Sequence, residues 1–355
     1  MNIGLDQISW YQAVEQAIGS FGDGIVHINM NGFFDMRFMS RDYGERGLYS
    51  YELEWIFEHF SKSFEINHYN ACYENKEFTK IVVYIETERA PNFIESLPIL
   101  DRIQGLYPSV EIICVHHDWK EYESKYIKIP SHLWAEETLI HQHGIQPFAG
   151  DDIDFPHNLT QEYFTQSNDV ERDKLFMCTN KTRRYHKDEL INFIRQNNLE
   201  DKGMISIKWE NIILEDSYQH LKIGKNPMQS FYNNVFCDLG PGSMHNTGIG
   251  YFESENIYKP FVYCVIPMIV SWPDYDIQLR KLGLDLFDDI IDTSFYQEGD
   301  LDKKFEIIKN NLYIIENTCV EHKRFKDNIW ERLLENNIKI KDQNNYVNYV
   351  KSFIG

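Results

Sequence analysis

Short, continuous apolar runs separated by segments of helical period constrain the fold of this chain most strongly. Five such runs occupy residues 25–30, 80–85, 110–115, 174–179 and 203–209. A strand that is apolar at every position is buried on both faces, which is typical of a parallel sheet covered by helices. Helical period returns between the runs, as in residues 91–107 and 189–198. The pattern predicts an α/β fold.

The length of the chain predicts more than one domain. Its 355 residues exceed one ordinary hydrophobic core. Residues 146–170 carry Pro, Gly, Asp and Asn without periodicity, which indicates a boundary. We therefore expect an N-terminal Rossmann-like domain at residues 1–160, a C-terminal Rossmann-like domain at 161–320 and C-terminal helices at 321–355. Aromatic residues near the end predict that these helices dock on the protein.

Composition excludes several broad classes of function. With 35 basic and 55 acidic residues the formal charge is −20, which argues against general binding of nucleic acid through neutralised phosphates. The six cysteines are scattered and favour buried free thiols over a disulfide framework or a zinc module. No apolar tract reaches the roughly 20 residues that a membrane span needs, and the amino end lacks the features of a signal peptide. The default expectation is a cytoplasmic protein.

The stretch from residue 240 to 291 is the most informative for function. Gly240, Gly242, Gly248 and Gly250 precede a predicted helix that carries Glu255 and Lys259. A glycine-rich loop followed by a helix is typical of a site that holds a phosphorylated ligand against backbone amides and one lysine. Glu255 and Lys259 are spaced i, i+4, so the alternative is that they pair with each other.

A basic loop follows the strand at residues 174–179. It carries Asn180, Lys181, Arg183, Arg184, His186 and Lys187. Arginine side chains suit bidentate recognition of phosphate, and the carboxyl end of a buried parallel strand is where such sheets hold ligands. The alternative is a solvated turn whose charges bind nothing, and this loop alone does not decide between the two.

In the amino-terminal half, the strand at residues 110–115 is followed by His116, His117 and Asp118. One of these side chains is a candidate general base, and the alternative is an ordinary turn in which Asp118 is a cap. His141 and His143 form an H-x-H pair without a third ligand at convincing spacing, so we predict no metal site.

Two segments together resemble a family of glycosyltransferase-like proteins of phages and other viruses. Residues 174–207 are similar to the family's strand, Asn, basic Arg-x-His turn, helix and second strand. Residues 251–270, with 279–292 behind them, are similar to its Ser/Thr-Glu-Lys, Lys-Pro and Leu-Gly-Phe motifs. The carboxyl-terminal domain of this family is related to exostosin-type and fucosyltransferase-type enzymes. One departure is Asn256, which stands where the family has a lysine after the glutamate.

The resemblance covers residues 173–295 and implies a GT-B architecture, in which two Rossmann-like domains face each other across a cleft. It implies a nucleotide-sugar donor, a uridine or guanosine diphosphate sugar, in the carboxyl half and an acceptor in the amino half. The donor-binding candidates are Asn180, Arg183, Arg184, His186, Gly248, Gly250, Glu255 and Lys259.

The leading hypothesis is a metal-independent glycosyltransferase that requires no further cofactor. Its candidate catalytic bases are Asp118, His117 and Asp35. The acceptor is either a glycan or a hydroxymethylated base in viral DNA, and a viral protein would act in the cytoplasm of its host. The alternative is a binding or assembly protein that keeps the fold without turnover.

Overall fold

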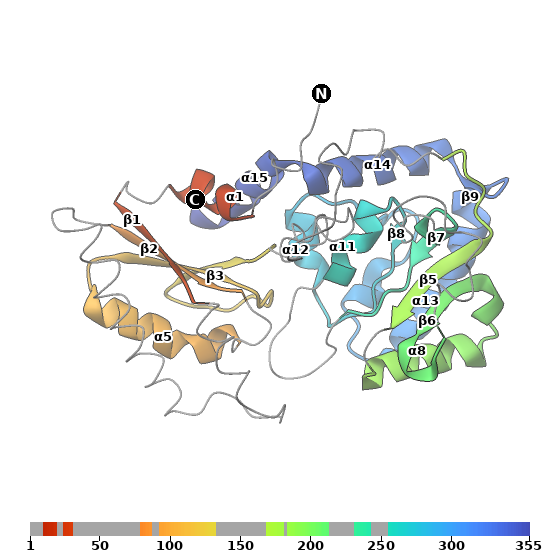
Figure 1. Cartoon of the computed structure of the whole chain (residues 1–355), viewed down its shortest axis with the longest axis horizontal. Coiled ribbons are helices and arrows are strands. Elements are labelled where there is room, and N and C mark those ends of the chain that lie inside the picture. The colour runs from red at the N-terminus through yellow and green to blue at the C-terminus, as the bar shows by residue number, and fades with distance from the viewer. Residues whose placement is uncertain are drawn as a thin grey trace, which may run out of the picture. The chain divides into compact units, whose positions relative to one another are not determined.

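Two four-stranded parallel sheets lie within the described part of the chain and confirm the α/β class. The computed structural model describes residues 10–19, 24–30, 79–86, 92–132, 168–180, 183–212, 231–242 and 255–355 (Figure 1). The chain divides into two compact units. The N-terminal unit comprises residues 10–133, 247–253 and 346–355, and the C-terminal unit comprises residues 1–9, 134–246 and 254–345.

The sheet of the N-terminal unit contains four parallel strands in sequential order. They are β1 (Ile25–Asn29), β2 (Lys80–Ile85), β3 (Glu111–His116) and β4 (Ile127–Pro130). Helix α5 (Phe93–Leu106) covers one face, while α1 (Trp10–Ile18) and α15 (Gln343–Ile354) lie on the other (Figure 1). Ile85 pairs with His116, and His116 pairs with Pro130, so the carboxyl ends of β2, β3 and β4 are level.

Burial explains why these segments form a sheet. All but the first residue of β2 are buried, as expected for its uninterrupted apolar run. Ile81, Val83 and Ile85 pack with the buried face of α5 in one apolar core. The side chain of Asn92 accepts a hydrogen bond from Glu95 N at 3.0 Å and so caps the start of α5.

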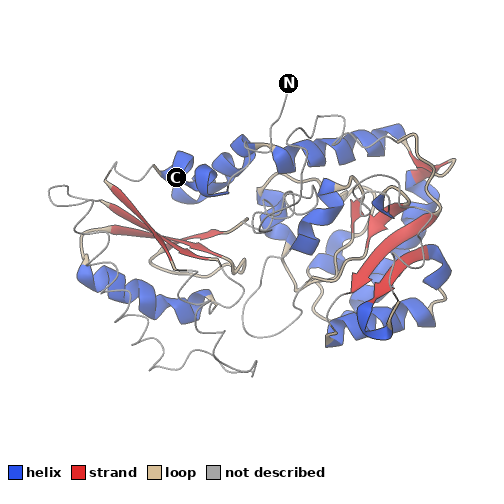
Figure 2. Cartoon of the chain, viewed as in Figure 1, coloured by secondary structure: helices blue, strands red, loops and turns tan. Residues whose placement is uncertain are grey.

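The C-terminal unit contains the second sheet, whose strand order is β6-β5-β7-β8. Its strands are β5 (Lys174–Asn180), β6 (Gly203–Ile207), β7 (Val235–Asp238) and β8 (Ile266–Pro267). Its helices are α8 (Tyr185–Gln196), α11 (Glu255–Val262), α12 (Asp276–Lys281), α13 (Leu301–Ile314) and α14 (Asp327–Lys341), as Figure 2 shows. A short antiparallel pair, β9 (Val320–Glu321) and β10 (Arg324–Phe325), lies between α13 and α14.

The end of the chain docks on the N-terminal unit, as its aromatic residues predicted. Tyr346 and Tyr349 of α15 are buried. The ring of Tyr349 meets that of His132 at 4.4 Å, and its hydroxyl donates to Pro130 O at 3.2 Å. Trp10 of α1 completes this aromatic cluster, with its ring 6.4 Å from Tyr346. Helix α15 therefore packs against the sheet of the N-terminal unit.

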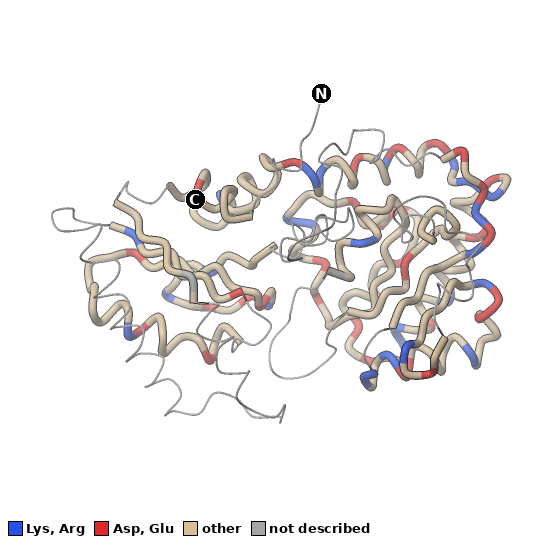
Figure 3. The backbone as a smooth tube through the Cα atoms, in the orientation of Figure 1, with Lys and Arg blue, Asp and Glu red and all other residues tan. Residues whose placement is uncertain are grey.

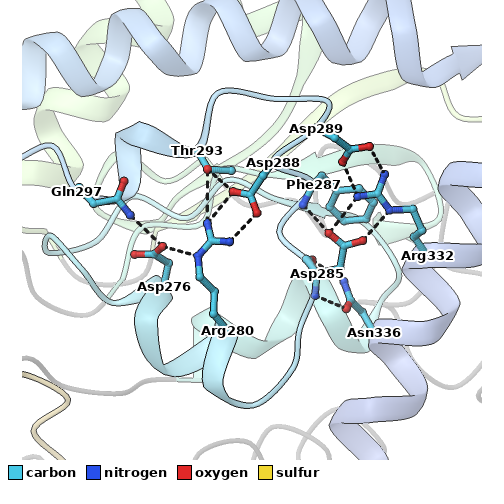
Figure 4. A network of polar contacts seen from close by, with 10 residues as sticks. All are labelled: Asp276, Arg280, Asp285, Phe287, Asp288, Asp289, Thr293, Gln297, Arg332 and Asn336. Atoms are coloured by element: carbon cyan, nitrogen blue, oxygen red, sulfur yellow. Dashed lines mark hydrogen bonds and ion pairs between the residues drawn. The ribbon is translucent and has the colours of Figure 1, made fainter.

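Charged residues of the C-terminal unit lie mainly on its helices and turns, while its strands are largely uncharged (Figure 3). Arg280 of α12 and Arg332 of α14 form a polar network with the acidic residues that follow α12 (Figure 4). Arg280 binds Asp276 at 2.8 Å and Asp288 at 2.6 Å, and Arg332 binds Asp285 at 2.6 Å and Asp289 at 2.7 Å. Because Arg280 donates to Asp288, the pKa of this carboxyl is held at about 2. The acidic motif at residues 285–289 is thus engaged in structural ion pairs.

Candidate functional site

The second sheet has a topological switch point between β5 and β7. The chain passes from β5 to β6 on one side of it, whereas β7 and β8 lie on the other side. The connections therefore leave the carboxyl ends of β5 and β7 in opposite directions, and open α/β sheets bind ligands in the crevice that results. We call Asn180, residues 238–242 and Ser271 at these strand ends the switch-point edge.

Asn180 ends β5, and its side chain is almost fully buried. Its Nδ2 donates to Cys178 Sγ at 3.3 Å. Its Oδ1 has no hydrogen-bond partner among the described residues. A buried amide oxygen without a partner costs free energy, so this atom is suited to a ligand hydroxyl or N–H group.

Asp238 ends β7 as a fully buried carboxylate. It accepts hydrogen bonds from Tyr232 Oη at 2.5 Å and from Gly240 N at 2.6 Å. Burial raises the pKa of Asp238 to about 6, while the bond from Tyr232, the charge of Lys259 and the amide of Gly240 act in the opposite direction. At neutral pH the carboxylate is mainly ionised and holds the start of the glycine-rich loop.

Gly242 needs to be glycine because the chain following β8 passes too close for a side chain. A Cβ atom at this position would lie 2.4 Å from Ser271 Oγ and 2.9 Å from Ser271 Cβ. Gly242 N donates to Val270 O at 2.8 Å, which extends the pairing of β7 and β8 beyond the strands. Ser271 is fully buried, and its Oγ lacks a partner within the described part of the chain.

His186 fixes the same loop from the first turn of α8. Its Nε2 donates to Gly242 O at 3.0 Å, and the side chain is buried. Burial lowers the pKa of His186 to about 4, so the ring is neutral at physiological pH. His186, predicted to bind the donor, thus contacts the backbone of the glycine-rich loop.

Helix α11 brings the predicted Lys259 to this region. Lys259 Nζ donates to Asn256 Oδ1 at 2.5 Å, and Asn256 Nδ2 donates to Pro241 O at 3.4 Å. The charge of Lys259 also lowers the pKa of Asp238, which places the ammonium near that carboxylate. Asn256, the residue that departs from the family pattern, therefore links the glycine-rich loop to Lys259.

The basic loop before α8 contributes one arginine that is engaged elsewhere. Arg183 is mostly exposed, and its Nε donates to both oxygens of Asp188, at 2.9 and 3.1 Å. Arg184 is half-buried at the N-cap of α8, where its side chain makes no capping bond. Two predicted donor residues, Gly248 and Gly250, lie outside the described residues, as does the side chain of Glu255.

The carboxyl edge of the first sheet holds two of the predicted catalytic residues. Asp118 is buried, and its carboxylate accepts hydrogen bonds from Phe93 N at 3.1 Å, Lys120 N at 3.0 Å and Tyr122 Oη at 2.9 Å. These contacts cap α5 and fix the turn after β3. The third predicted base, Asp35, lies outside the described residues.

His117 is buried next to this turn. Its Nδ1 donates to Ile85 O at 3.0 Å, so Nε2 carries the lone pair of the neutral ring. Burial lowers the pKa of His117 to about 4. Beside it, Glu86 Oε1 accepts hydrogen bonds from Trp10 Nε1 and Ser131 Oγ, each at 2.6 Å. Sequence reasoning missed Glu86 because it is a single acid after an apolar strand.

Other residues at the switch-point edge were also missed. Asp238 ends an apolar strand, as Asn180 does, but no basic loop follows it to mark the strand end. Ser271 is brought to Gly242 by a tertiary contact without any local motif.

The described residues hold no group of three or more His, Cys, Asp or Glu side chains that could bind a metal ion. Within the same ranges, no helix combines the length and apolar character needed to cross a membrane. Comparisons with protein-family models, with curated proteins and with solved structures found no match.

Proposed function

We propose that this protein is a glycosyltransferase that binds a nucleotide-sugar at the switch-point edge and transfers the sugar to an acceptor hydroxyl. The observation that carries the proposal is the pair of buried atoms, Asn180 Oδ1 and Ser271 Oγ, which lack partners among the described residues. Asn180 ends β5, and Ser271 lies against Gly242 in the loop after β7. Their position at the switch point of a parallel sheet is where α/β enzymes bind nucleotides.

The proposed reaction requires compensation of the negative charge that grows on the leaving diphosphate. Lys259 and Arg184 supply positive charge near the glycine-rich loop, and Arg183 does so after release from Asp188. In this proposal Glu255 binds hydroxyls of the ribose or of the donor sugar, because a carboxylate accepts two such bonds. The charge comes from the protein, so the reaction is proposed without an obligatory metal ion.

The acceptor is proposed to lie at the carboxyl edge of the first sheet. Of the two described candidate bases, His117 is favoured over Asp118, because the carboxylate of Asp118 already accepts three structural hydrogen bonds. Because Nδ1 of His117 is bound to Ile85 O, Nε2 is the ring nitrogen that would accept the proton in this proposal. Asp35 stays a candidate from the sequence alone.

Isothermal calorimetry with uridine, guanosine and adenosine diphosphates tests the donor site. We expect one of them to bind and Arg183→Glu to weaken binding at least about tenfold, since charge-assisted bonds contribute about 1.5–3 kcal/mol. Arg324→Glu is the matched control, because Arg324 is an exposed arginine on β10. Its neighbour Lys323 accepts a backbone hydrogen bond from Arg172 N, and Arg172 precedes β5, so this control lies toward the amino end of β5, away from the switch-point edge. Equal affinities for Arg183→Glu and the wild type would remove Arg183 from the site.

Incubation of the protein with the matching nucleotide-sugar and an acceptor panel tests turnover. The panel contains oligosaccharides, duplex DNA and duplex DNA with hydroxymethylated cytosine. Release of free nucleotide only with a glycan supports the glycan acceptor, and release only with the modified duplex supports the DNA acceptor. In the latter case affinity should fall as salt rises.

A second candidate function is a non-catalytic binding protein on the same fold. The engagement of Asp118 in capping bonds and the presence of Asn256 in place of a lysine favour it. Tight nucleotide binding without nucleotide release, with every acceptor, supports this function over catalysis.

A further inference from the structure

Lys304 is a buried cation that the sequence pattern does not single out. It lies in the first turn of α13, which Asp300 caps by accepting hydrogen bonds from the backbone N–H groups of Asp302 and Lys303. The side chain of Lys304 is fully buried, and its Nζ donates to Ser271 O at 2.7 Å. A buried ammonium is costly to desolvate and therefore needs a structural or functional reason.

Lys304 contacts the switch-point edge directly, through its hydrogen bond to the carbonyl of Ser271. Ser271, whose carbonyl Lys304 holds, packs so tightly against Gly242 that no side chain fits there. From the other side, His186 holds the carbonyl of Gly242. Side chains of α13 and α8 thus fix the carbonyls of two neighbouring loops, one after β8 and one after β7. The charge of Lys304 also contributes to the lowered pKa of His186, so these two groups lie close together.

The charges around Lys304 keep its ammonium protonated at neutral pH. Burial lowers the pKa of Lys304 to about 8, and the carboxylates of Glu298, Asp274 and Asp276 oppose this shift. Asp276 is shared with Arg280 at 2.8 Å and with Gln297 at 2.9 Å, so its charge is partly offset. Of the titratable groups around Lys304, the His186 ring is neutral at physiological pH, and the three carboxylates are negative.

We propose that Lys304 is a positioning residue of the ligand site, which holds the Ser271 loop against Gly242 and supplies a buried positive charge to the phosphates of the ligand. This inference rests on the proposed nucleotide-binding function. The ligand class it implies is a phosphate-bearing anion. Because the charge is lost when Lys304 deprotonates, the affinity for such an anion should fall as pH rises through about 8.

The test compares the wild type with Lys304→Met, Lys304→Arg and Lys303→Met, the last being a control in the same helical turn. Affinity for inorganic pyrophosphate and for the nucleoside diphosphate that binds the wild type is measured from pH 6.5 to 9. The wild type should lose affinity about five- to tenfold across this range, because a nearby unit charge is removed. Lys304→Met should bind about five- to tenfold more weakly at pH 7 with no step near pH 8. Lys304→Arg should bind without the step, and Lys303→Met should match the wild type.

A second measurement needs no variant. Calorimetry of the wild type at pH 8, in buffers of different ionisation enthalpy, should show proton uptake on binding, because an anion favours the charged form of Lys304. A folded Lys304→Met with wild-type affinity and pH profile, or zero proton uptake, overturns the role of Lys304 while leaving the nucleotide site intact. Absence of any binding to the wild type overturns the proposed function and this inference together.

Discussion

The close contact between Gly242 and Ser271 makes Gly242→Ala an informative perturbation. The new methyl carbon would lie 2.4 Å from Ser271 Oγ, 2.9 Å from Ser271 Cβ and 3.5 Å from Ser271 Cα. Carbon atoms in ordinary contact are about 3.5–4.0 Å apart. Rotation about χ1 can move the hydroxyl, but the Cβ atom moves only with its backbone. The backbone is restrained, because Gly242 N binds Val270 O and Gly242 O accepts from His186.

We expect Gly242→Ala to lower the free energy of unfolding by about 1–3 kcal/mol, the usual cost of overpacking. Ser271→Gly should recover most of that loss in the double variant, whereas Ser271→Ala, which keeps Cβ, should recover less. Urea denaturation of the single and double variants yields the coupling energy of a double-mutant cycle. Gly299→Ala is the control, since its new methyl would be 3.7 Å from Pro273 Cγ, an ordinary contact.

A coupling energy indistinguishable from zero would refute this reasoning. It would mean that Gly242 tolerates a side chain by a movement away from Ser271, and that the two loops are not held together. A loss of stability in Gly299→Ala equal to that in Gly242→Ala would refute it as well. Pyrophosphate affinity, measured on the same variants, shows whether the contact also matters for the proposed ligand.

Three further predictions concern separate features. Arg332→Ala should lower the free energy of unfolding by about 1–3 kcal/mol in urea, and Arg332→Lys should recover less than half, because lysine lacks the planar fork that binds two carboxylates. The pKa of Asp238 is raised to about 6, so its contribution to stability is present below about pH 4 and is lost as pH rises through 6. Urea denaturation of the wild type and of Asp238→Asn should show that their difference in free energy of unfolding changes between pH 4 and 6. The difference should stay constant above pH 7. Tyr185, 74% exposed beside the basic loop, should stack on the nucleobase. In calorimetry Tyr185→Ala should weaken nucleoside diphosphate binding by about 1–3 kcal/mol without affecting pyrophosphate binding. Tyr313, 68% exposed near the end of α13, is the control, and Tyr313→Ala should change neither affinity.

The strands were predictable where apolar runs were long enough to be buried on both faces. The run at residues 80–85 coincides with β2, and the run at 110–115 begins and ends one residue before β3. In the two four-stranded sheets, β4 was not predicted, and the segment in which β7 begins could not be assigned to helix or strand. β4 alternates apolar and charged residues and ends at Pro130, while β7 has four residues and directly follows Asn233 and Asn234. A strand of four residues gives too little periodicity to distinguish it from a turn.

The residues of the candidate site also differ in whether a local sequence pattern reveals them. Asn180, His186 and Lys259 could be proposed because each occupies a local pattern, a strand end or a helix after glycines. Ser271 and Lys304 could not, because they reach this region through contacts between residues distant in the sequence. Ser271 contacts Gly242, 29 residues away, and Lys304 contacts Ser271, 33 residues away. Whether a position must be glycine depends on which distant residue packs against it, and the local sequence does not show which residue that is.

The charge balance at the switch-point edge follows from these buried groups and not from the overall charge of −20. Asp238 brings one negative charge beneath the glycine-rich loop at neutral pH, and burial makes this charge easier to neutralise than that of an exposed aspartate. Lys304 brings a positive charge that burial makes easier to lose. Both shifts act in the same direction on an anionic ligand, because raising the pH ionises the carboxylate near pH 6 and discharges the ammonium near pH 8. We therefore expect the proposed phosphate-bearing ligand to bind most tightly at the acidic end of this range. Lys259 is close enough to lower the pKa of Asp238, and its positive charge offsets the negative charge of this carboxylate between pH 6 and pH 8.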